Sequence, residues 1–363
     1  MRKYRQLTTE LTFRCNAKCP ACHRQKPLTI DLNDKKYTIT LENFKKLFYP
    51  ELLKNVEWLM LNGNFGDSIM NKQFREIISY VKSHDTKLKI HTNGGIHGVD
   101  YWKDVGSILT KQDIINFDMD GLADTHSKYR INTEFENVFR NACTVIDNSN
   151  TQVHWKYIVF EHNKHQVEEA RELAKKNNFH TFSTVKTSRD VFAPKTGKFV
   201  HSKKTSAYDK AEKVIRCVWD DWGKWYISPE GLVFRCCWTG GHYYDQGEKR
   251  FYYPRKFELM FNGLHVPLEK ILSYEYWTKL QNYLKGYDRS FKLCKSQCGK
   301  LISSIEKEED NLKTGQKTYF AAHAENSQRC KQILKKVNLN LLELSIGVFD
   351  VMKKLENLPP LEN

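Results

Sequence analysis

Three cysteines near the start of the chain constrain its folding more than any other feature. Cys15, Cys19 and Cys22 have the spacing C-x3-C-x2-C. Pro20 and Asn16 disfavour a regular helix here, so the backbone can curl and turn the three sulfurs inward. A structural zinc site needs four ligands, whereas three local thiolates leave one coordination position free. An iron–sulfur cube with one iron not bound by the protein fits this set, and buried core thiols or half of a zinc site are the alternatives.

Predicted strands and helices alternate through residues 7–186. The runs that predict strands are residues 7–13, 58–62, 88–92, 114–119, 153–160 and 181–186. Helical spacing covers residues 41–54, 74–81 and 135–146. Asn163, with Gln166 three residues later, resembles a capping box that opens a helix ending at Lys176. Six strand and helix units predict an α/β fold with a parallel sheet, a partial (β/α)6 TIM-like barrel.

Short polar turns follow three of these strands. They are G-N-F-G-D at residues 63–67, T-N-G-G at 92–95 and D-M-D-G at 118–121. Since the active face of a parallel barrel lies at the carboxyl ends of its strands, these turns and the cysteine loop are expected to meet at one mouth. Gly63 and Gly66 would let the backbone approach a ligand, and Asn64 or Asp67 would accept from an ammonium group. The simpler interpretation of each is an ordinary glycine turn.

The cysteine spacing at the end of a first strand resembles the signature of the radical SAM superfamily. The resemblance implies that Cys15, Cys19 and Cys22 hold a [4Fe-4S] cluster whose fourth iron is chelated by S-adenosylmethionine (SAM). An electron, delivered by an external donor such as flavodoxin or ferredoxin, would cleave SAM to a 5′-deoxyadenosyl radical that abstracts hydrogen from a substrate. One departure is Ala21, because the family usually has an aromatic residue there.

The same resemblance implies contacts to SAM at the strand ends. The turn that contains Gly63, Asn64 and Asp67 is similar to the family's G-G-E motif for the methionyl amine. Asp118 stands where relatives often carry a serine for the ribose hydroxyls. Arg130 is in a Y-R pair whose arginine would bind the methionine carboxylate in a forked geometry, although a surface arginine is the simpler interpretation. Asn93 is the weakest candidate, because N-G is common in turns.

A second group of cysteines follows after residue 216. Residues 225–227 and 232–234 predict a hairpin about the turn Ser228–Gly231, which would return Cys236 toward Cys217. The pattern C-x13-G-x4-C, with Cys294 and Cys298 downstream, resembles the SPASM and twitch extensions of radical SAM enzymes. Too few cysteines remain for a full SPASM domain, so the resemblance implies one auxiliary [4Fe-4S] cluster of the twitch type. Two alternatives remain: the same four thiolates could hold a zinc ion, and Cys237 could be the ligand in place of Cys236.

These features divide the chain into four predicted regions. They are a radical SAM barrel over 1–190, a linker or substrate loop over 191–216, a twitch-type domain over 217–300 and a C-terminal helical extension over 301–363. Cys143 and Cys330 are interpreted as buried thiols. The chain has no apolar run of membrane-spanning length, and its first residues lack a signal-peptide core, so a cytoplasmic protein is predicted.

Charge and composition bear on the substrate. The 58 Lys and Arg against 43 Asp and Glu give a net charge of +15, which favours an anionic partner or is simply a Lys-rich surface. Aromatic and basic residues interleave over 241–257, as in surfaces that bind nucleobases or an extended peptide.

Several functions remain open at this stage. We expect a radical SAM oxidoreductase or modifying enzyme that acts on a peptide or protein side chain. Modification of a nucleotide or DNA base, oxidation of a small alcohol, and a non-catalytic zinc-stapled nucleic-acid-binding protein are the alternatives. No catalytic acid or base can be named, although Lys156, Tyr157 and Glu161 are near a strand end.

Overall fold

The chain folds into two compact units. One comprises residues 1–209 and 218–277, and the other residues 210–217 and 278–363. The structure, a computed structural model, describes residues 4–186, 191–193, 198–200, 213–215, 224–244, 258–259, 261–273 and 299–301. In the second unit, β9 (Lys213–Ile215) pairs with β12 (Gly299–Leu301) in antiparallel register. The first unit holds every other described element.

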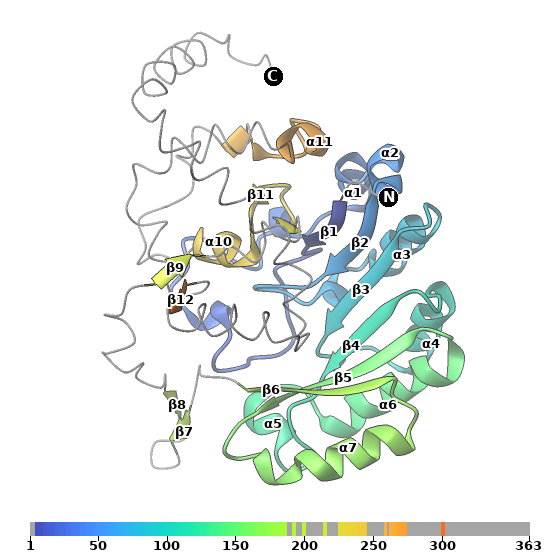
Figure 1. Cartoon of the computed structure of the whole chain (residues 1–363), viewed down its shortest axis with the longest axis vertical. Helices are drawn as coiled ribbons and strands as arrows, with labels where there is room; N and C mark the ends of the chain where they lie inside the picture. Colours follow the sequence, from blue (N-terminus) through green and yellow to red (C-terminus); the bar gives the residue numbers. More distant parts are fainter. Residues whose placement is uncertain are drawn as a thin grey trace, which may run out of the picture. The chain divides into compact units, whose positions relative to one another are not determined.

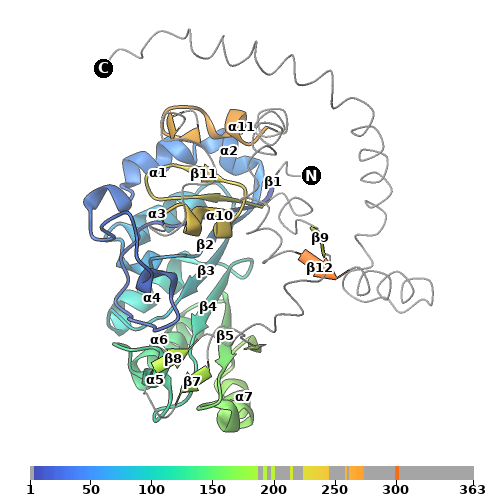
Figure 2. The same cartoon turned by 90° about the vertical axis from the view of Figure 1, so that its left-hand side faces the viewer.

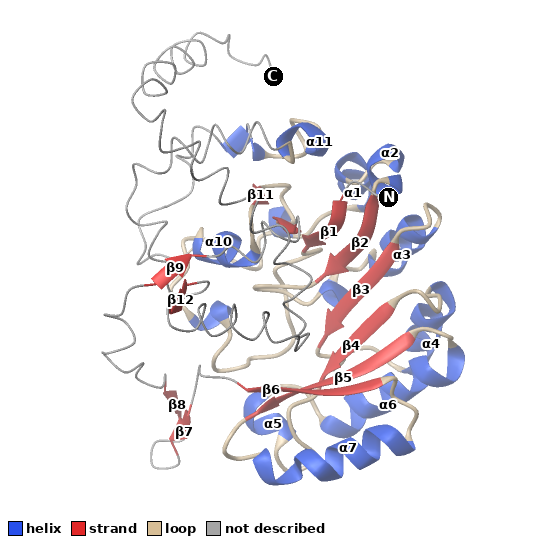
Figure 3. Cartoon of the chain, viewed as in Figure 1, coloured by secondary structure: helices blue, strands red, loops and turns tan. Residues whose placement is uncertain are grey.

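An eight-stranded sheet forms the centre of the first unit (Figure 3). Its strands, in spatial order, are β11 (Val233–Phe234), β10 (Lys224–Ile227), β1 (Tyr4–Thr9), β2 (Val56–Leu61), β3 (Lys87–Thr92), β4 (Ile114–Asp118), β5 (Gln152–Val159) and β6 (Thr181–Lys186). All neighbours are parallel except β11, which returns antiparallel to β10. A short hairpin, β7 (Val191–Ala193) with β8 (Lys198–Val200), is separate from this sheet. The predicted α/β fold is therefore confirmed.

Helices cover the convex side of the sheet (Figure 1 and Figure 2). The α-helices are α1 (Leu41–Leu47), α2 (Pro50–Lys54), α3 (Phe74–Lys82), α4 (Val99–Ile108), α5 (His126–Tyr129), α6 (Phe135–Asn148), α7 (Val167–Lys176), α10 (Cys237–His242) and α11 (Leu268–Ile271). The short 3-10 helices are η1 (His23–Gln25), η2 (Lys35–Tyr37), η3 (Ser68–Met70) and η4 (Lys164–Gln166). No described helix has the length and apolar character needed to cross a bilayer.

The core lies between the sheet and these helices. On α3, the residues at helical spacing Phe74, Ile77, Ile78 and Val81 are all fully buried. Alternate residues of the strands meet this layer, and Leu59 of β2 and Phe117 of β4 are also fully buried. The fold is thus held by apolar burial on the outer side of the sheet, which leaves the inner side available for other chemistry.

The structure corrects several predicted boundaries. The helix over 41–54 is broken because Pro50, at the first position of α2, cannot donate a helical hydrogen bond. The strand over 7–13 ends at Thr9, and α4 was not predicted.

The predicted capping box at Asn163 is wrong. Asn163 Oδ1 accepts from the backbone N–H of Phe160, and its Nδ2 donates to the carbonyls of Asp120 and Ile158. The side chain therefore closes the turn after β5 and ties it to the turn after β4. Because these bonds use both ends of the amide, the side chain does not cap the helix that follows.

Candidate functional site

The three cysteines lie in one partly buried wall beyond the end of β1. Cys15, Cys19 and Cys22 pack around Ala17, Tyr129 and Phe160. Within the loop, the N–H of Cys22 donates to the Cys19 carbonyl at 3.1 Å, and the Lys18 N–H donates outside the loop, to the Ile131 carbonyl, at 2.9 Å. Arg24 Nη1 donates to the Cys15 carbonyl at 3.1 Å. The predicted trio is therefore brought together on one surface.

The thiols of Cys15 and Cys19 lie in surroundings that favour their protonated form. Burial, more than any other cause, raises the pKa of Cys15 to about 12 and that of Cys19 to about 11. Thiolates at these positions therefore need a cation beside them, and binding a metal centre would release their protons. Across the described part of the chain, no three His, Cys, Asp or Glu side chains converge tightly enough to hold a single metal ion.

The turns after β2 and β3 are tied to the cysteine loop through Asp67. Its Oδ2 accepts from the backbone N–H and from Nδ2 of Asn93, both at 2.7 Å, and from Thr92 Oγ1 at 3.0 Å. Asn93 Nδ2 also lies 3.6 Å from Cys15 Sγ and 3.0 Å from Asn16 Oδ1. Asn93, the weakest sequence candidate, thus reaches the first cysteine, whereas the Asp67 carboxyl is engaged within the protein.

Glu10 was missed by the sequence analysis. Its carboxylate accepts from three successive backbone N–H groups, those of Asn64 at 2.6 Å, Phe65 at 3.1 Å and Gly66 at 3.0 Å. The Tyr226 hydroxyl of β10 also donates to it. Burial raises the pKa of Glu10 to about 7, and these hydrogen bonds oppose the rise. A single acid in T-T-E-L gives no pattern from which this role could be found.

The glycine turn packs directly against the cysteine loop. A Cβ on Gly66 would overlap the carbonyl oxygen of Thr12, and one on Gly63 would overlap the carbonyl of Gly66. The same Cβ on Gly66 would come within 3.0 Å of the Arg14 carbonyl oxygen, which accepts from the N–H of Asp67 at 2.9 Å. These glycines therefore allow a close approach to the cysteine loop, whereas their predicted approach to a ligand stays a prediction.

Helix α10 closes one side of this region. Asn64 Nδ2 donates to the Cys237 carbonyl at 2.7 Å, and His23 Nε2 lies 3.0 Å from the Gly241 carbonyl oxygen. Cys236 is buried and its Sγ accepts from the N–H of Thr239 at the start of the helix. The other predicted ligands of a second centre, Cys217, Cys294 and Cys298, lie outside the described residues.

Arg130 lies beside the cysteines between two acids. Its Nε donates to Asp120 Oδ2 at 2.6 Å, and its Nη2 is 3.6 Å from Asp118 Oδ2. Burial raises the pKa of the Asp120 carboxyl, and the Arg130 guanidinium opposes that rise. Arg130 also favours the thiolate of Cys19. Asp118 Oδ1 is buried with no hydrogen-bond partner among the described residues, so it is the atom of this network that is available to a ligand.

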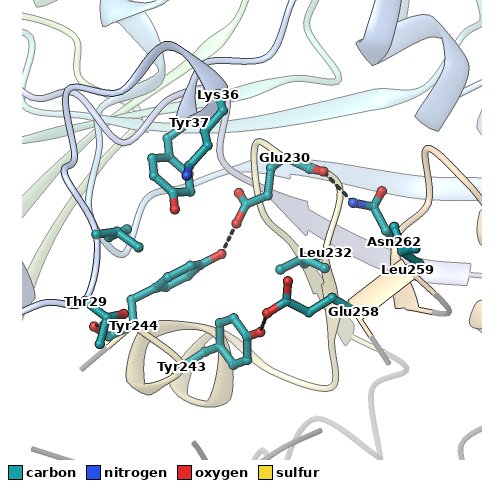
Figure 4. Close-up of a pocket in the computed structure, with 11 residues that line it drawn as sticks. Thr29, Lys36, Tyr37, Glu230, Leu232, Tyr243, Tyr244, Glu258, Leu259 and Asn262 are labelled. Atoms are coloured by element: carbon teal, nitrogen blue, oxygen red, sulfur yellow. Dashed lines mark hydrogen bonds between the residues drawn. The ribbon is translucent and has the colours of Figure 1, made fainter. Parts of the chain in front are cut away.

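A separate cavity of about 320 Å³ lies near β11 (Figure 4). Its lining residues are Thr29, Ile30, Lys36, Tyr37, Glu230, Leu232, Tyr243, Tyr244, Glu258, Leu259 and Asn262. The Tyr244 hydroxyl donates to Glu230, and the Tyr243 hydroxyl donates to Glu258. None of the three loop cysteines lines it, so this cavity is not the candidate active site.

A substitution at Gly66 tests the close approach to the cysteine loop. We expect Gly66→Ala to lower the free energy of unfolding by about 1–3 kcal/mol, because the new methyl group must displace backbone. Labelling of Cys15 by a thiol reagent, followed by mass spectrometry, should also become faster. The matched control is Gly98→Ala, where a Cβ would meet no atom within 4 Å. Equal urea midpoints for the two variants would show that the turn does not press on the loop.

The cavity acid Glu230 predicts a dependence of stability on pH. Burial raises its pKa from 4.5 to about 7, so the folded protein holds this proton more tightly than the unfolded chain does. The contribution of this proton to the free energy of unfolding is fully present below pH 4.5. It is lost, at about 1.4 kcal/mol per pH unit, as the pH rises toward 7. Glu230→Gln mimics the neutral acid. Its urea midpoint should match the wild-type value at low pH and exceed it above pH 7, and parallel pH curves would contradict the assignment.

Comparison with known proteins places the fold. No protein-family model and no curated protein sequence matches the chain. SuiB from Streptococcus suis has a TM-score of 0.53 at 11% identity, over 77% of this chain and 68% of SuiB. A histidine-tagged form of anSMEcpe with bound AdoMet has a TM-score of 0.51 at 15% identity, over 81% of this chain and 88% of that one. The chain therefore shares its fold with SuiB and with the AdoMet-binding protein anSMEcpe.

Proposed function

We propose that this protein is a radical SAM enzyme, with Cys15, Cys19 and Cys22 holding a [4Fe-4S] cluster at the carboxyl end of β1. The observations that carry the proposal are that the three cysteines share one wall beyond the end of β1 and that Asn93, after the end of β3, reaches Cys15. A fold shared with a protein solved with bound AdoMet supports it. When bound, the cluster would supply the electron that cleaves SAM to a 5′-deoxyadenosyl radical.

The residues around the cysteines have different proposed roles. Asp118 Oδ1, buried and without a partner in the described structure, would accept from a ribose hydroxyl of SAM. Arg130 is already between Asp118 and Asp120, so its guanidinium would supply positive charge beside Cys19. It would bind a SAM carboxylate only while shared with these two acids. Asp67 would act by positioning, because its oxygens already hold the turn after β3.

The auxiliary site and the substrate belong to the same proposal. Cys217, Cys236, Cys294 and Cys298 would bind one further [4Fe-4S] cluster of the twitch type. A peptide or protein side chain is the favoured substrate, and one structure of anSMEcpe contains AdoMet and a Cp18Cys peptide (TM-score 0.50, 15% identity, 81% of this chain and 89% of that one). The proposed regions 1–190, 191–216, 217–300 and 301–363 follow from these two cysteine sets.

Anaerobic reconstitution tests the reaction class. We expect a brown protein with about eight irons per chain, of which Cys15→Ala loses about four. With dithionite and SAM, the wild-type protein should release 5′-deoxyadenosine, detected by chromatography, and Cys15→Ala should release none. The control is Cys143→Ala on α6, which should keep both iron and activity. A colourless protein that contains zinc and does not cleave SAM would instead support the non-catalytic nucleic-acid binder.

A further inference from the structure

The inner face of the sheet, which is the side away from the apolar helix layer, carries polar side chains. On β3, Leu88 and Ile90 are fully buried on the helix side, and Lys89 and His91 alternate with them on the inner side. Parallel strands that are covered on both faces by apolar side chains read as continuous hydrophobic runs. The alternation on β3 shows that its inner side faces something polar.

Strands β4 and β5, which follow β3 in the sheet, continue this pattern. On β5, Trp155 is fully buried on the helix side, and His154 and Lys156 are on the inner side. On β4, the inner positions are Ile114, Asn116 and Asp118, and Ile114 is in register with Lys89. We call Lys89, His91, His154 and Lys156 the inner basic patch.

Strand register brings the members of this patch together. His91 pairs with Asn116, which pairs with His154, so the two histidines flank one amide in a single row. Asn116 Nδ2 lies 3.5 Å from His91 Nε2. Lys156 is in the next row toward the carboxyl edge, and Lys89 is one row in the other direction. Two lysines thus bracket a row of neutral hydrogen-bonding groups.

The charges of the patch are not balanced. Burial lowers the pKa of Lys89, and repulsion from Lys156 lowers it further. Burial also lowers the pKa of His91 to about 4 and that of His154 to about 4, so both imidazoles are neutral at pH 7. Among the residues that the structure describes, neither lysine forms an ion pair. Asp118 is beside Lys156 in the strand register, but it already lies 3.6 Å from Arg130, and the row of Lys89 contains no acid. Two half-buried lysines that repel each other with so little compensation are unfavourable.

Hydrogen-bonding capacity is also unused in the patch. His154 Nε2 is buried and has no hydrogen-bond partner within the described residues. The same ring stacks on His180, with ring centroids 5.4 Å apart, which fixes its plane. A fixed neutral imidazole with a free nitrogen is suited to bind an oxygen of a ligand.

We propose that the inner basic patch binds an anionic group, a carboxylate or a phosphate, carried by the substrate of the proposed radical SAM reaction. The anion would lie between Lys89 and Lys156 and would accept hydrogen bonds from the neutral row between them. The identification of the anion's carrier as a substrate rests on the proposed function. The patch itself exists independently of that function.

The position of Lys89 favours the substrate over SAM as the source of the anion, whereas Lys156 pairs with Asp118, the residue proposed to contact SAM. Asn93, which reaches Cys15, is four residues beyond Lys89, or about 13 Å along an extended chain at about 3.3 Å per residue. Cofactor bound at the cysteines would be at the carboxyl edge of the sheet. A group held by Lys89 would be deeper, where a substrate must enter to meet a radical formed at that edge.

Binding of inorganic phosphate to the intact protein tests the patch. Compared with chloride at equal ionic strength, millimolar phosphate should raise the unfolding temperature of the wild-type protein by about 2–4 °C. Lys89→Met and Lys156→Met should each abolish this shift. They should also unfold at a higher temperature than wild type without any anion, because the repulsion is removed. Lys175→Met, at an exposed position of α7, is the control and should behave as wild type does.

Two further arms identify the source and the chemistry of the anion. If the phosphate shift persists when SAM is saturating, the site belongs to the substrate; if SAM removes the shift, the patch binds the SAM carboxylate and the proposal is wrong. Acetate in place of phosphate distinguishes a carboxylate from a phosphate preference. An equal phosphate shift in wild type and both patch variants also overturns the proposal. Release of 5′-deoxyadenosine in the absence of substrate is measured separately. The Lys89→Met variant should still release it. If neither the wild-type protein nor the variant releases it, the proposed function is wrong.

Discussion

The buried carboxylate of Glu10 is the interaction on which the active end of the sheet depends. It follows β1 directly, accepts from the backbone of the turn after β2, and accepts from Tyr226 of β10, so one side chain joins three neighbouring strands. A carboxylate removed from water is costly unless its lone pairs are satisfied, and four donors supply that compensation here. The cost ensures that the three segments are held in one arrangement, because separating any of them would leave the charge or its donors unpaired.

The cysteine loop takes its shape from its neighbours more than from itself. Its own hydrogen bonds are short-range turns, whereas the glycine turn presses on Thr12 and Asp67 bridges to Asn93, which reaches Cys15. The conformation of the loop is therefore supported by protein contacts that do not involve a metal centre. Support from rigid strand ends lets the thiols be arranged in advance, which is the usual advantage of sites built on a sheet.

Sequence reasoning found the parts that depend on local pattern. Strand positions, the α/β fold and the hairpin of β10 and β11 follow from periodicity and turn residues. The roles of particular polar groups did not follow in the same way. Asn64 and Asp67 look like ligand contacts in a one-dimensional motif, but their partners are the Cys237 carbonyl and the turn at Asn93, which are distant in sequence. Glu10 has no pattern at all, since its donors come from other strands.

The polar inner face shows the same limit, because the alternation K-L-K-I-H-T alone predicts a strand with one side in water, whereas the curved sheet places that side inside the fold. Elsewhere the protein treats a largely buried cation differently, since Arg130 is held by both Asp118 and Asp120. Lys89 has no acid in its row, Lys156 is beside only Asp118, which is shared with Arg130, and the two lysines repel each other. Marginal stability gives a chain little room to keep an uncompensated repulsion that serves no purpose. Arg130 thus has two acids beside it, whereas the repulsion between Lys89 and Lys156 is not compensated by an ion pair among the described residues. An anion bound from outside would supply that compensation.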